Sequence, residues 1–196
     1  MGKYRICDKY THRDEILYFD DTDNTDKYQD VIYEKACQFY KGKKLNSVLD
    51  LGCGSAYKLF KYFGSENITG IDLEDTVKFL KRKYPESKWL VSDFDNPPAD
   101  RFDMVICADM IEHVMHPDQV FDFINKLDFQ YLVLSTPDRN FIKHYDDYIM
   151  GPPRNKYHVR EWTSDEFKFF VSDYFSLLVH SMEDSHDQFV ICEKNI

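Results

Sequence analysis

The chain has 196 residues, a length that suits one domain with a substantial core, and we expect a single domain over residues 1–196. Hydrophobic residues make up 43% and aromatic residues 16%, which is a globular composition and excludes an intrinsically disordered chain. The net charge of −10 argues against a general nucleic-acid binder, because such a protein needs a basic face.

Short apolar runs alternate with helical stretches along most of the chain. Residues 1–25 are polar and acidic, so they are expected to form a loosely held arm, and a helix is predicted from Asp26 to about Tyr40. Strands are then predicted at residues 47–51, 67–71, 88–92, 102–108 and 131–136, with helical stretches among them at residues 55–63, 74–84 and 117–127. Such alternation predicts an α/β fold with a parallel sheet covered by helices on both faces.

The last part of the chain departs from this alternation. Residues 163–174 have helical periodicity, with Thr163 as a candidate N-cap. Two strand candidates follow at residues 175–182 and 188–194. Because no helix separates these strands, they predict an antiparallel hairpin at the edge of the sheet.

The cysteines and the N-terminus indicate a compartment. Five cysteines are an odd number and lack CxxC spacing, so neither a disulfide framework nor a structural zinc site is predicted. This pattern favours a reducing cytoplasm. The first residues, "MGKYRICDKY", are polar, and no apolar run approaches the length of a membrane span, so neither a signal peptide nor a membrane helix is expected.

The stretch "VLDLGCGSAYKLF", residues 48–60, reads as a buried strand, a glycine turn and a helix. Gly52 and Gly54 fit a GxGxxG dinucleotide fingerprint, but Tyr57 stands in place of its third glycine, which weakens an NAD interpretation. Asp50, just before the turn, suits a ligand with a nearby positive charge, such as an ammonium or sulfonium group. Asp72, after the next strand, suits a ribose diol because a carboxylate can accept from both hydroxyls.

Five segments resemble, in order, the successive motifs of class I S-adenosylmethionine-dependent methyltransferases. They are "VLDLGCGSA", "GIDL", "VSDF", "FDMVICADMIEHV" and "YLVLSTPDR", and they cover roughly residues 45–140. The resemblance implies a Rossmann-like, seven-stranded, mostly parallel sheet with a C-terminal antiparallel hairpin, and S-adenosylmethionine as cofactor. The cofactor-binding residues that it implies are Gln29, Asp50, Gly52, Cys53, Gly54, Lys58, Asp72, Leu73, Asp93, Phe94 and Ala108.

The resemblance also implies a role for each part of this set. The glycine turn would lie against the methionine part of the cofactor, and Asp72 would hold the ribose. Leu73 would cover the adenine, Asp93 and Phe94 would meet its edge, and Ala108 would close the site near the sulfonium.

Three further residues have open roles. Lys58 can reach the carboxylate of the ligand or remain solvated. Gln29 and Tyr33, on the first predicted helix, can form a lid over the cofactor, although ordinary packing is favoured for Tyr33.

The segment "ADMIEHVMHP", residues 108–117, offers chemistry for methyl transfer. A hydroxyl acceptor must lose its proton to a base or a metal-bound species. If the segment is helical, Asp109, Glu112 and His113 occupy positions i, i+3 and i+4 and share one face. A loop after residue 150 would bring His158 to the same rim of the sheet. Oxygen and imidazole ligands suit Mg, Mn or Fe, and without a metal His113 is the candidate catalytic base.

This segment resembles two branches of the family. The ubiquinone-biosynthesis O-methyltransferases have a similar acid-x-x-Glu-His sequence, and the small-RNA 3′-terminal 2′-O-methyltransferases add a downstream His like that of "HVREWTSDEF". The resemblance to the RNA branch places Asp109, Glu112, His113 and His158 on its metal-ligand positions. Asp109 departs from the usual Glu and has a shorter reach.

Basic residues gather near the same rim. Arg139, Arg154, His158 and Arg160 are the predicted substrate-binding residues, because arginine forks match phosphate or carboxylate groups. Trp162 is expected to anchor this loop on the sheet. The alternative is a solvated loop whose cations pair with acids, namely Asp146, Asp147 and Glu161.

The favoured function is methyl transfer to a small, anionic acceptor, at oxygen rather than nitrogen, in bacterial or phage metabolism or surface-glycan synthesis. Neither nucleic acid nor a membrane is an expected partner, and the oligomeric state stays open. The alternatives are a metal-dependent RNA 3′-terminal 2′-O-methyltransferase, supported by the His158 segment, and a non-catalytic cofactor-binding subunit.

Overall fold

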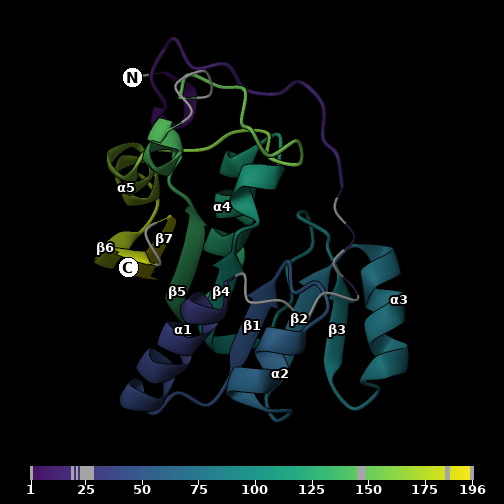
Figure 1. Cartoon of the computed structure of the whole chain (residues 1–196). Coiled ribbons are helices and arrows are strands. Elements are labelled where there is room, and N and C mark those ends of the chain that lie inside the picture. The colour runs from purple at the N-terminus through teal and green to yellow at the C-terminus, as the bar shows by residue number, and fades with distance from the viewer. Residues whose placement is uncertain are drawn as a thin grey trace.

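The computed structural model describes residues 2–18, 20, 22, 29–144, 149–183 and 186–194, and a seven-stranded sheet in the order β3-β2-β1-β4-β5-β7-β6 forms its centre (Figure 1). Five strands are parallel, namely β1 (Val48–Leu51), β2 (Ile68–Asp72), β3 (Lys88–Val91), β4 (Arg101–Ala108) and β5 (Asp128–Pro137). β7 (Asp187–Glu193) pairs antiparallel with β5, and β6 (Ser176–Glu183) pairs with β7 as the outermost strand. The predicted α/β fold and terminal hairpin are confirmed.

Helices cover both faces of the sheet because alternate residues of each strand point to opposite sides. α1 (Asp30–Lys43), α2 (Tyr57–Phe63) and α3 (Glu74–Lys83) share a core with Met104 and Ile106 of β4. α4 (Pro117–Lys126) and α5 (Ser164–Ser172) pack in a second core with Val105 and Cys107 of the same strand. None of the helices within the described residues is long and apolar enough to cross a membrane.

The first helix begins later than predicted. Gln29 precedes α1 with a left-handed φ of 64°, so helical geometry begins at Asp30 rather than at Asp26. Residues 26–28 of the predicted helix lie outside the described residues. α5 begins as predicted, since the Thr163 hydroxyl accepts from the backbone N–H of Glu166 and the Glu166 side chain accepts from the backbone of Thr163.

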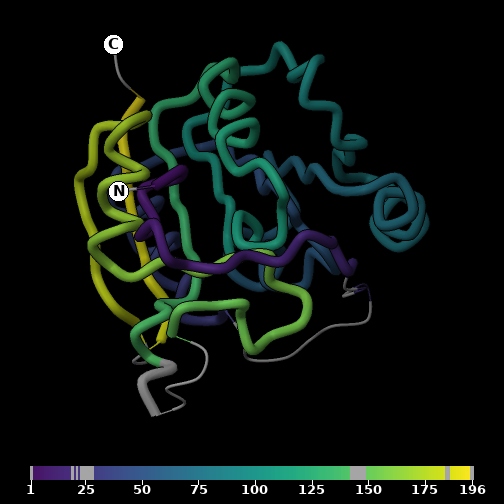
Figure 2. The backbone as a smooth tube through the Cα atoms, turned by 90° about the horizontal axis from the view of Figure 1, so that it is seen from above, coloured from purple at the N-terminus to yellow at the C-terminus, as the bar shows by residue number. Residues whose placement is uncertain are grey.

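The N-terminal segment is attached more firmly than predicted. Ile6, next to the 3₁₀ turn η1 (Lys3–Arg5), is buried in the core, and the Trp162 indole donates to the carbonyl of Tyr4. The backbone N–H of Arg13 donates to the carbonyl of Val159, so this segment runs beside the loop that follows residue 149 (Figure 2). The expectation of a loosely held arm is therefore wrong for residues 2–13, because their attachments are distant in sequence.

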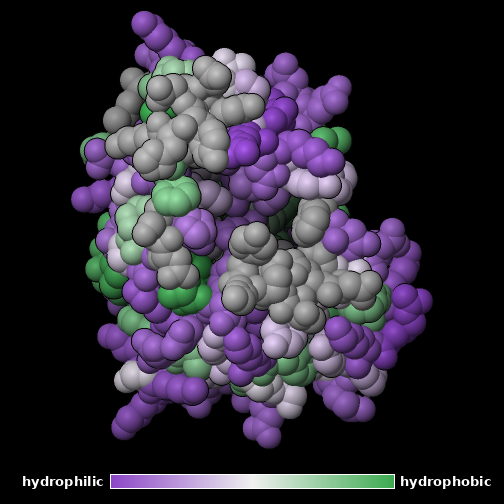
Figure 3. Space-filling view, in the orientation of Figure 1, coloured by the Kyte–Doolittle hydropathy of each residue, from purple (hydrophilic) through white to green (hydrophobic). Residues whose placement is uncertain are grey.

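The surface agrees with the acidic composition. Figure 3 shows a mostly hydrophilic face with small hydrophobic areas among the polar side chains. Along β6, the side chains of Leu178, Val179 and Met182 are exposed, as expected for the outermost strand of a sheet.

Candidate active site

The glycine turn that follows β1 requires glycine because of its backbone conformation and, at Gly52, because of a close neighbour. Gly52 and Gly54 have φ values of 78° and 49°, in the left-handed region that glycine adopts without strain. A Cβ added to Gly52 would also lie 2.9 Å from Cγ of Met110. The backbone N–H of Gly52 donates to the carbonyl of Ile71 at 2.8 Å, so the turn is tied to the end of β2, and Cys53 within the turn is buried.

Asp72 lies at the end of β2 with its carboxylate held against this turn. Oδ2 accepts from the backbone N–H of Gly54 at 2.8 Å, and Oδ1 accepts from the backbone N–H of Leu73 at 2.7 Å. A carboxylate has about four acceptor positions, so two remain for the hydroxyls of a ribose. The Leu73 side chain beside it is 52% exposed, which leaves its surface accessible to a ligand.

The first helix covers the turn through two polar contacts. The Tyr33 hydroxyl donates to Oδ2 of Asp50 at 2.9 Å, and both side chains are buried, in agreement with the packing role expected of Tyr33. Burial, followed by the Asp50 charge, raises the pKa of Tyr33 well above its ordinary value. The Gln29 side-chain amide donates to the carbonyl of Ala108 at 3.5 Å, so the start of α1 reaches the end of β4.

An open pocket of about 820 Å³ lies beyond the end of β3, a volume typical of small-molecule sites. Asp93 and Phe94 line it, next to Gln119 and Asp122 of α4. The Asp93 carboxylate accepts from the side-chain amide of Asn96, which lowers the pKa of Asp93. Their predicted place at the adenine edge agrees with this pocket and remains a prediction.

The segment after β4 is not the helix that the sequence predicted. Asp109 has a left-handed φ of 45°, and the Ser135 hydroxyl donates to its Oδ1 at 2.6 Å. Only a single 3₁₀ turn, η2 (Ile111–His113), follows it. The shared helical face predicted for Asp109, Glu112 and His113 is therefore wrong, because pairing of β4 with β5 holds Asp109 at the end of the sheet.

Three of the four predicted metal ligands nevertheless come together. The ligand atoms of Glu112, His113 and His158 all lie within 4.8 Å of one another, whereas Asp109 is not among them. The His158 loop is fixed to this cluster, because the backbone N–H of Val159 donates to the carbonyl of Glu112 at 2.8 Å.

The Glu112 carboxylate is fully buried and only half satisfied. Oε2 accepts from the Thr136 hydroxyl at 3.2 Å, but Oε1 has no hydrogen-bond partner. Burial, and then the charge of Asp109, raise the pKa of Glu112 well above its ordinary value. Burial likewise raises the pKa of Asp109, while the Ser135 hydroxyl, followed by the nearby His158 and Lys58, opposes this rise.

The two imidazoles of the cluster are oriented through Nδ1. His113 Nδ1 donates to the carbonyl of Tyr157 at 2.9 Å, and His158 Nδ1 donates to Oε1 of Glu161 at 2.6 Å. Their ring centroids are 4.8 Å apart at 89°. Burial, with His158 nearby, lowers the pKa of His113 to about 4, so this imidazole is neutral near pH 7.

These groups fit a divalent cation. A buried carboxylate oxygen without a partner and two imidazoles held through Nδ1 are the arrangement that metal ligands adopt. Sequence reasoning treated Glu161 only as a surface acid, and Ser135, Tyr157 and Asn155 were missed. The strand-end sequence "LST" was a weak signal for Ser135, whereas the other contacts depend on the conformation of the loop.

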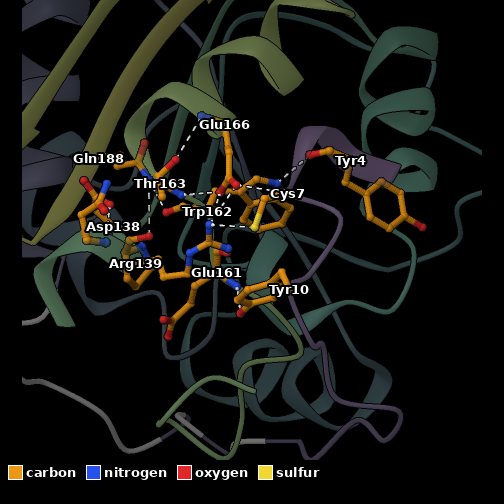
Figure 4. Close-up of polar contacts among 12 residues, drawn as sticks. Tyr4, Cys7, Tyr10, Asp138, Arg139, Glu161, Trp162, Thr163, Glu166 and Gln188 are labelled. Carbon is orange, nitrogen blue, oxygen red and sulfur yellow. Dashed lines mark hydrogen bonds and ion pairs between the residues drawn. The ribbon is translucent and has the colours of Figure 1, made fainter. Parts of the chain in front are cut away.

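Two of the predicted substrate-binding arginines are structural instead. Arg139 is 3% exposed, and its guanidinium donates to Glu166 at 2.8 Å and lies 4.4 Å from the ring centroid of Tyr10 (Figure 4). Arg160 is 2% exposed and donates to the carbonyls of Val114 and Met115. Their predicted binding to an acceptor is wrong, because both guanidinium groups are committed inside the protein.

Some of the remaining residues of the loop that carries His158 are exposed, and others are buried. The side chains of Arg154 and Lys156 are exposed, so their substrate-binding role stays a prediction. Trp162 is fully buried and stacks on Phe170 with an interplanar angle of 6°, which confirms its anchoring role. Of the acids considered as partners, Asp146 and Asp147 lie outside the described residues, whereas Glu161 is buried against His158.

A family model and two known proteins match this chain. A family model described as a methyltransferase domain matches residues 13–177. The mitochondrial ubiquinone biosynthesis O-methyltransferase of Candida albicans is 30% identical over 119 residues, which cover 54% of this chain and 36% of that protein. Its counterpart from Actinobacillus pleuropneumoniae is 32% identical over 102 residues, which cover 45% of this chain and 42% of that protein. The chain thus spans less than half the length of either relative.

Solved structures share the fold at low sequence identity. Magnesium protoporphyrin IX methyltransferase from Synechocystis, with bound SAH, has a TM-score of 0.69 at 16% identity, covering 93% of this chain and 90% of that one. The small RNA methyltransferase HEN1 has a TM-score of 0.65 at 18% identity, covering 94% of this chain and 27% of that one.

Proposed function

This chain belongs to the methyltransferase domain family, and we propose that it is an S-adenosylmethionine-dependent methyltransferase that methylates an oxygen atom of its acceptor at the Glu112–His113–His158 cluster. The observation that carries this proposal is the buried Glu112 Oε1, which has no hydrogen-bond partner and lies beside two imidazoles held through Nδ1.

The cofactor would lie across the ends of the first strands. Gly52, Gly54 and Asp72 would hold its amino acid and ribose parts, and Asp93 with Phe94 would line the adenine end. When bound, S-adenosylmethionine supplies an electrophilic methyl group on its sulfonium. The cluster begins four residues after Ala108, so an acceptor held there would lie near the methyl group, and such positioning supplies much of the catalysis of an in-line displacement.

The acceptor hydroxyl must lose its proton during transfer. Glu112, His113 and His158 would hold a Mg, Mn or Fe ion, whose chemistry at this place would be to lower the pKa of the acceptor hydroxyl. His113 alone is a poor alternative as a general base, because a pKa of about 4 leaves it with little affinity for a proton.

For the acceptor we propose a small molecule with a phosphate or carboxylate group, within bacterial or phage metabolism or surface-glycan synthesis. Arg154 and Lys156 are exposed on the loop that delivers His158, and they are the cations that would bind this group. The two curated ubiquinone O-methyltransferases, which act on oxygen by name, support the choice of an oxygen acceptor.

A second candidate is methylation of an RNA 3′ end. It is favoured by the position of His158 in the cluster and by the structural likeness to the small RNA methyltransferase HEN1. The net charge of −10 disfavours it, because RNA binding depends on neutralising phosphates.

The test is methyl transfer from labelled S-adenosylmethionine to a panel of sugar phosphates, catechols and short RNA duplexes, each with and without chelator. We expect a small-molecule acceptor, loss of activity with chelator and restoration by Mg, Mn or Fe. Glu112→Gln should lose activity while retaining S-adenosylhomocysteine binding. Full activity in chelator would refute the cation, and methylation of RNA alone would select the second candidate.

A further inference from the structure

Both ring nitrogens of His158 have partners from its own loop. Nδ1 lies 2.6 Å from Oε1 of Glu161, and Nε2 lies 2.9 Å from Nδ2 of Asn155. The partners stand three residues after and three residues before the histidine. His158 and Glu161 are buried, whereas Asn155 is exposed.

The orientation of Asn155 determines where the proton of His158 lies. The backbone N–H of Tyr157 donates to Oδ1 of Asn155 at 3.0 Å, so the oxygen of the amide is committed to that bond. The amide nitrogen therefore faces His158, and because it can only donate, Nε2 must accept. His158 is then neutral with its hydrogen on Nδ1. An imidazolium would place two donors face to face at Nε2.

We propose that Glu161 and Asn155 are positioning residues for His158. Glu161 fixes the tautomer that keeps the lone pair on Nε2, and Asn155 occupies that lone pair until a divalent cation takes its place. The exposed Asn155 side chain can turn into solvent when it gives up Nε2, so it competes with the cation without blocking it. This inference rests on the cation of the proposed function.

The contacts of Glu161 leave its carboxylate to bind Nδ1 of His158. Its backbone N–H donates to the Tyr10 hydroxyl at 3.0 Å, and its carbonyl accepts from Arg139 at 3.3 Å (Figure 4). Its second carboxylate oxygen is buried and has no hydrogen-bond partner. The bond to Nδ1 is thus the one that satisfies the carboxylate.

The first experiment reads the tautomer of His158 without any metal, by ¹⁵N NMR of chelator-treated protein, with His158→Gln for assignment. Wild type, Asn155→Ala and Glu161→Gln should carry hydrogen on Nδ1, since an acceptor oxygen remains. The double variant Glu161→Ala, Asn155→Ala should show hydrogen on Nε2, because Nδ1 has lost its acceptor and Nε2 no longer faces a donor. The exposed Glu86→Ala serves as control. Hydrogen on Nε2 in wild type, or hydrogen kept on Nδ1 in the double variant, would overturn the role of Glu161.

The second experiment measures Mn²⁺ affinity by calorimetry. Glu161→Ala should bind roughly tenfold to a hundredfold more weakly, as expected when a partner of a metal-ligating histidine is lost. Asn155→Ala should bind roughly threefold to tenfold more tightly, the worth of one net hydrogen bond. Weaker or equal binding in Asn155→Ala would contradict the competition. If wild type binds no Mn²⁺, the cation and the competition both fall, while the tautomer result decides the role of Glu161 separately.

Discussion

Asp72 joins the glycine turn to the predicted ribose site through single hydrogen bonds to Gly54 and Leu73. Asp72→Ala removes a charged acceptor that would bind two ribose hydroxyls, and hydrogen bonds to charged groups contribute about 1.5–3 kcal/mol each. We expect S-adenosylhomocysteine to bind at least about tenfold more weakly by calorimetry. Asp75→Ala, an exposed neighbour on α3, is the matched control, and equal affinity in both variants would remove Asp72 from the ribose site.

The lowered pKa of His113 predicts that the stability of the protein depends on pH. Its folded pKa of about 4 is depressed from an ordinary 6.5, so its contribution is present above pH 6.5 and is lost as the pH falls towards 4. Between pH 7 and pH 5 this amounts to about 2 kcal/mol. Urea unfolding at both pH values should show wild type losing that much more stability than His113→Gln, which keeps a donor for Tyr157 but does not titrate. Equal losses would mean that His113 is not buried as described.

At this scale the sequence predicted positions where the constraint is local. The turn at Gly52 and Gly54 and the strand end at Asp72 are where their own sequence placed them, and their contact with the cofactor stays a prediction. The buried state of Arg139 and Arg160 depends on partners far along the chain, so a basic sequence was taken for a basic surface.

Among the elements, α5 is stabilised by more than its capping box. The Glu166 carboxylate accepts from the backbone of Thr163 and Cys7 and pairs with the buried Arg139. Glu166→Ala leaves that guanidinium without its charge partner, so we expect a loss of about 3–5 kcal/mol in the free energy of unfolding. Thr163→Ala removes only a cap and should cost about 1 kcal/mol. Urea denaturation compares the two, and equal losses would show that the ion pair contributes nothing.

The elements themselves were predictable because periodicity and end signals are local. The 3.6-residue pattern identified α3 and α4 within a residue or two, and the missing helix between the last strands identified the hairpin. The N-terminal segment was misread because its polar sequence hides the few residues, such as Ile6 and Tyr10, that attach it to distant parts of the chain.

Across the whole molecule, the candidate site gathers at one edge of the sheet. The glycine turn, Asp72, Asp93 and Glu112 follow the carboxyl ends of β1 to β4, and Thr136 lies near the end of β5. Ligands of open α/β sheets bind at this edge. The order of the strands therefore predicts where the candidate site lies, whereas the meeting of His113 with His158 depends on the loop between β5 and α5.

The acidic composition of the molecule predicts weak binding to RNA. Each RNA phosphate that a protein neutralises adds to the salt dependence of binding, and a net charge of −10 opposes such contacts outside a local basic group such as Arg154 and Lys156. We expect no saturable binding of a short RNA duplex in a filter assay at physiological salt. The double variant Arg154→Ala, Lys156→Ala should behave like wild type there. Saturable binding that weakens steeply with added salt and disappears in the double variant would establish a basic RNA contact on this loop, and the acceptor would then be an RNA end.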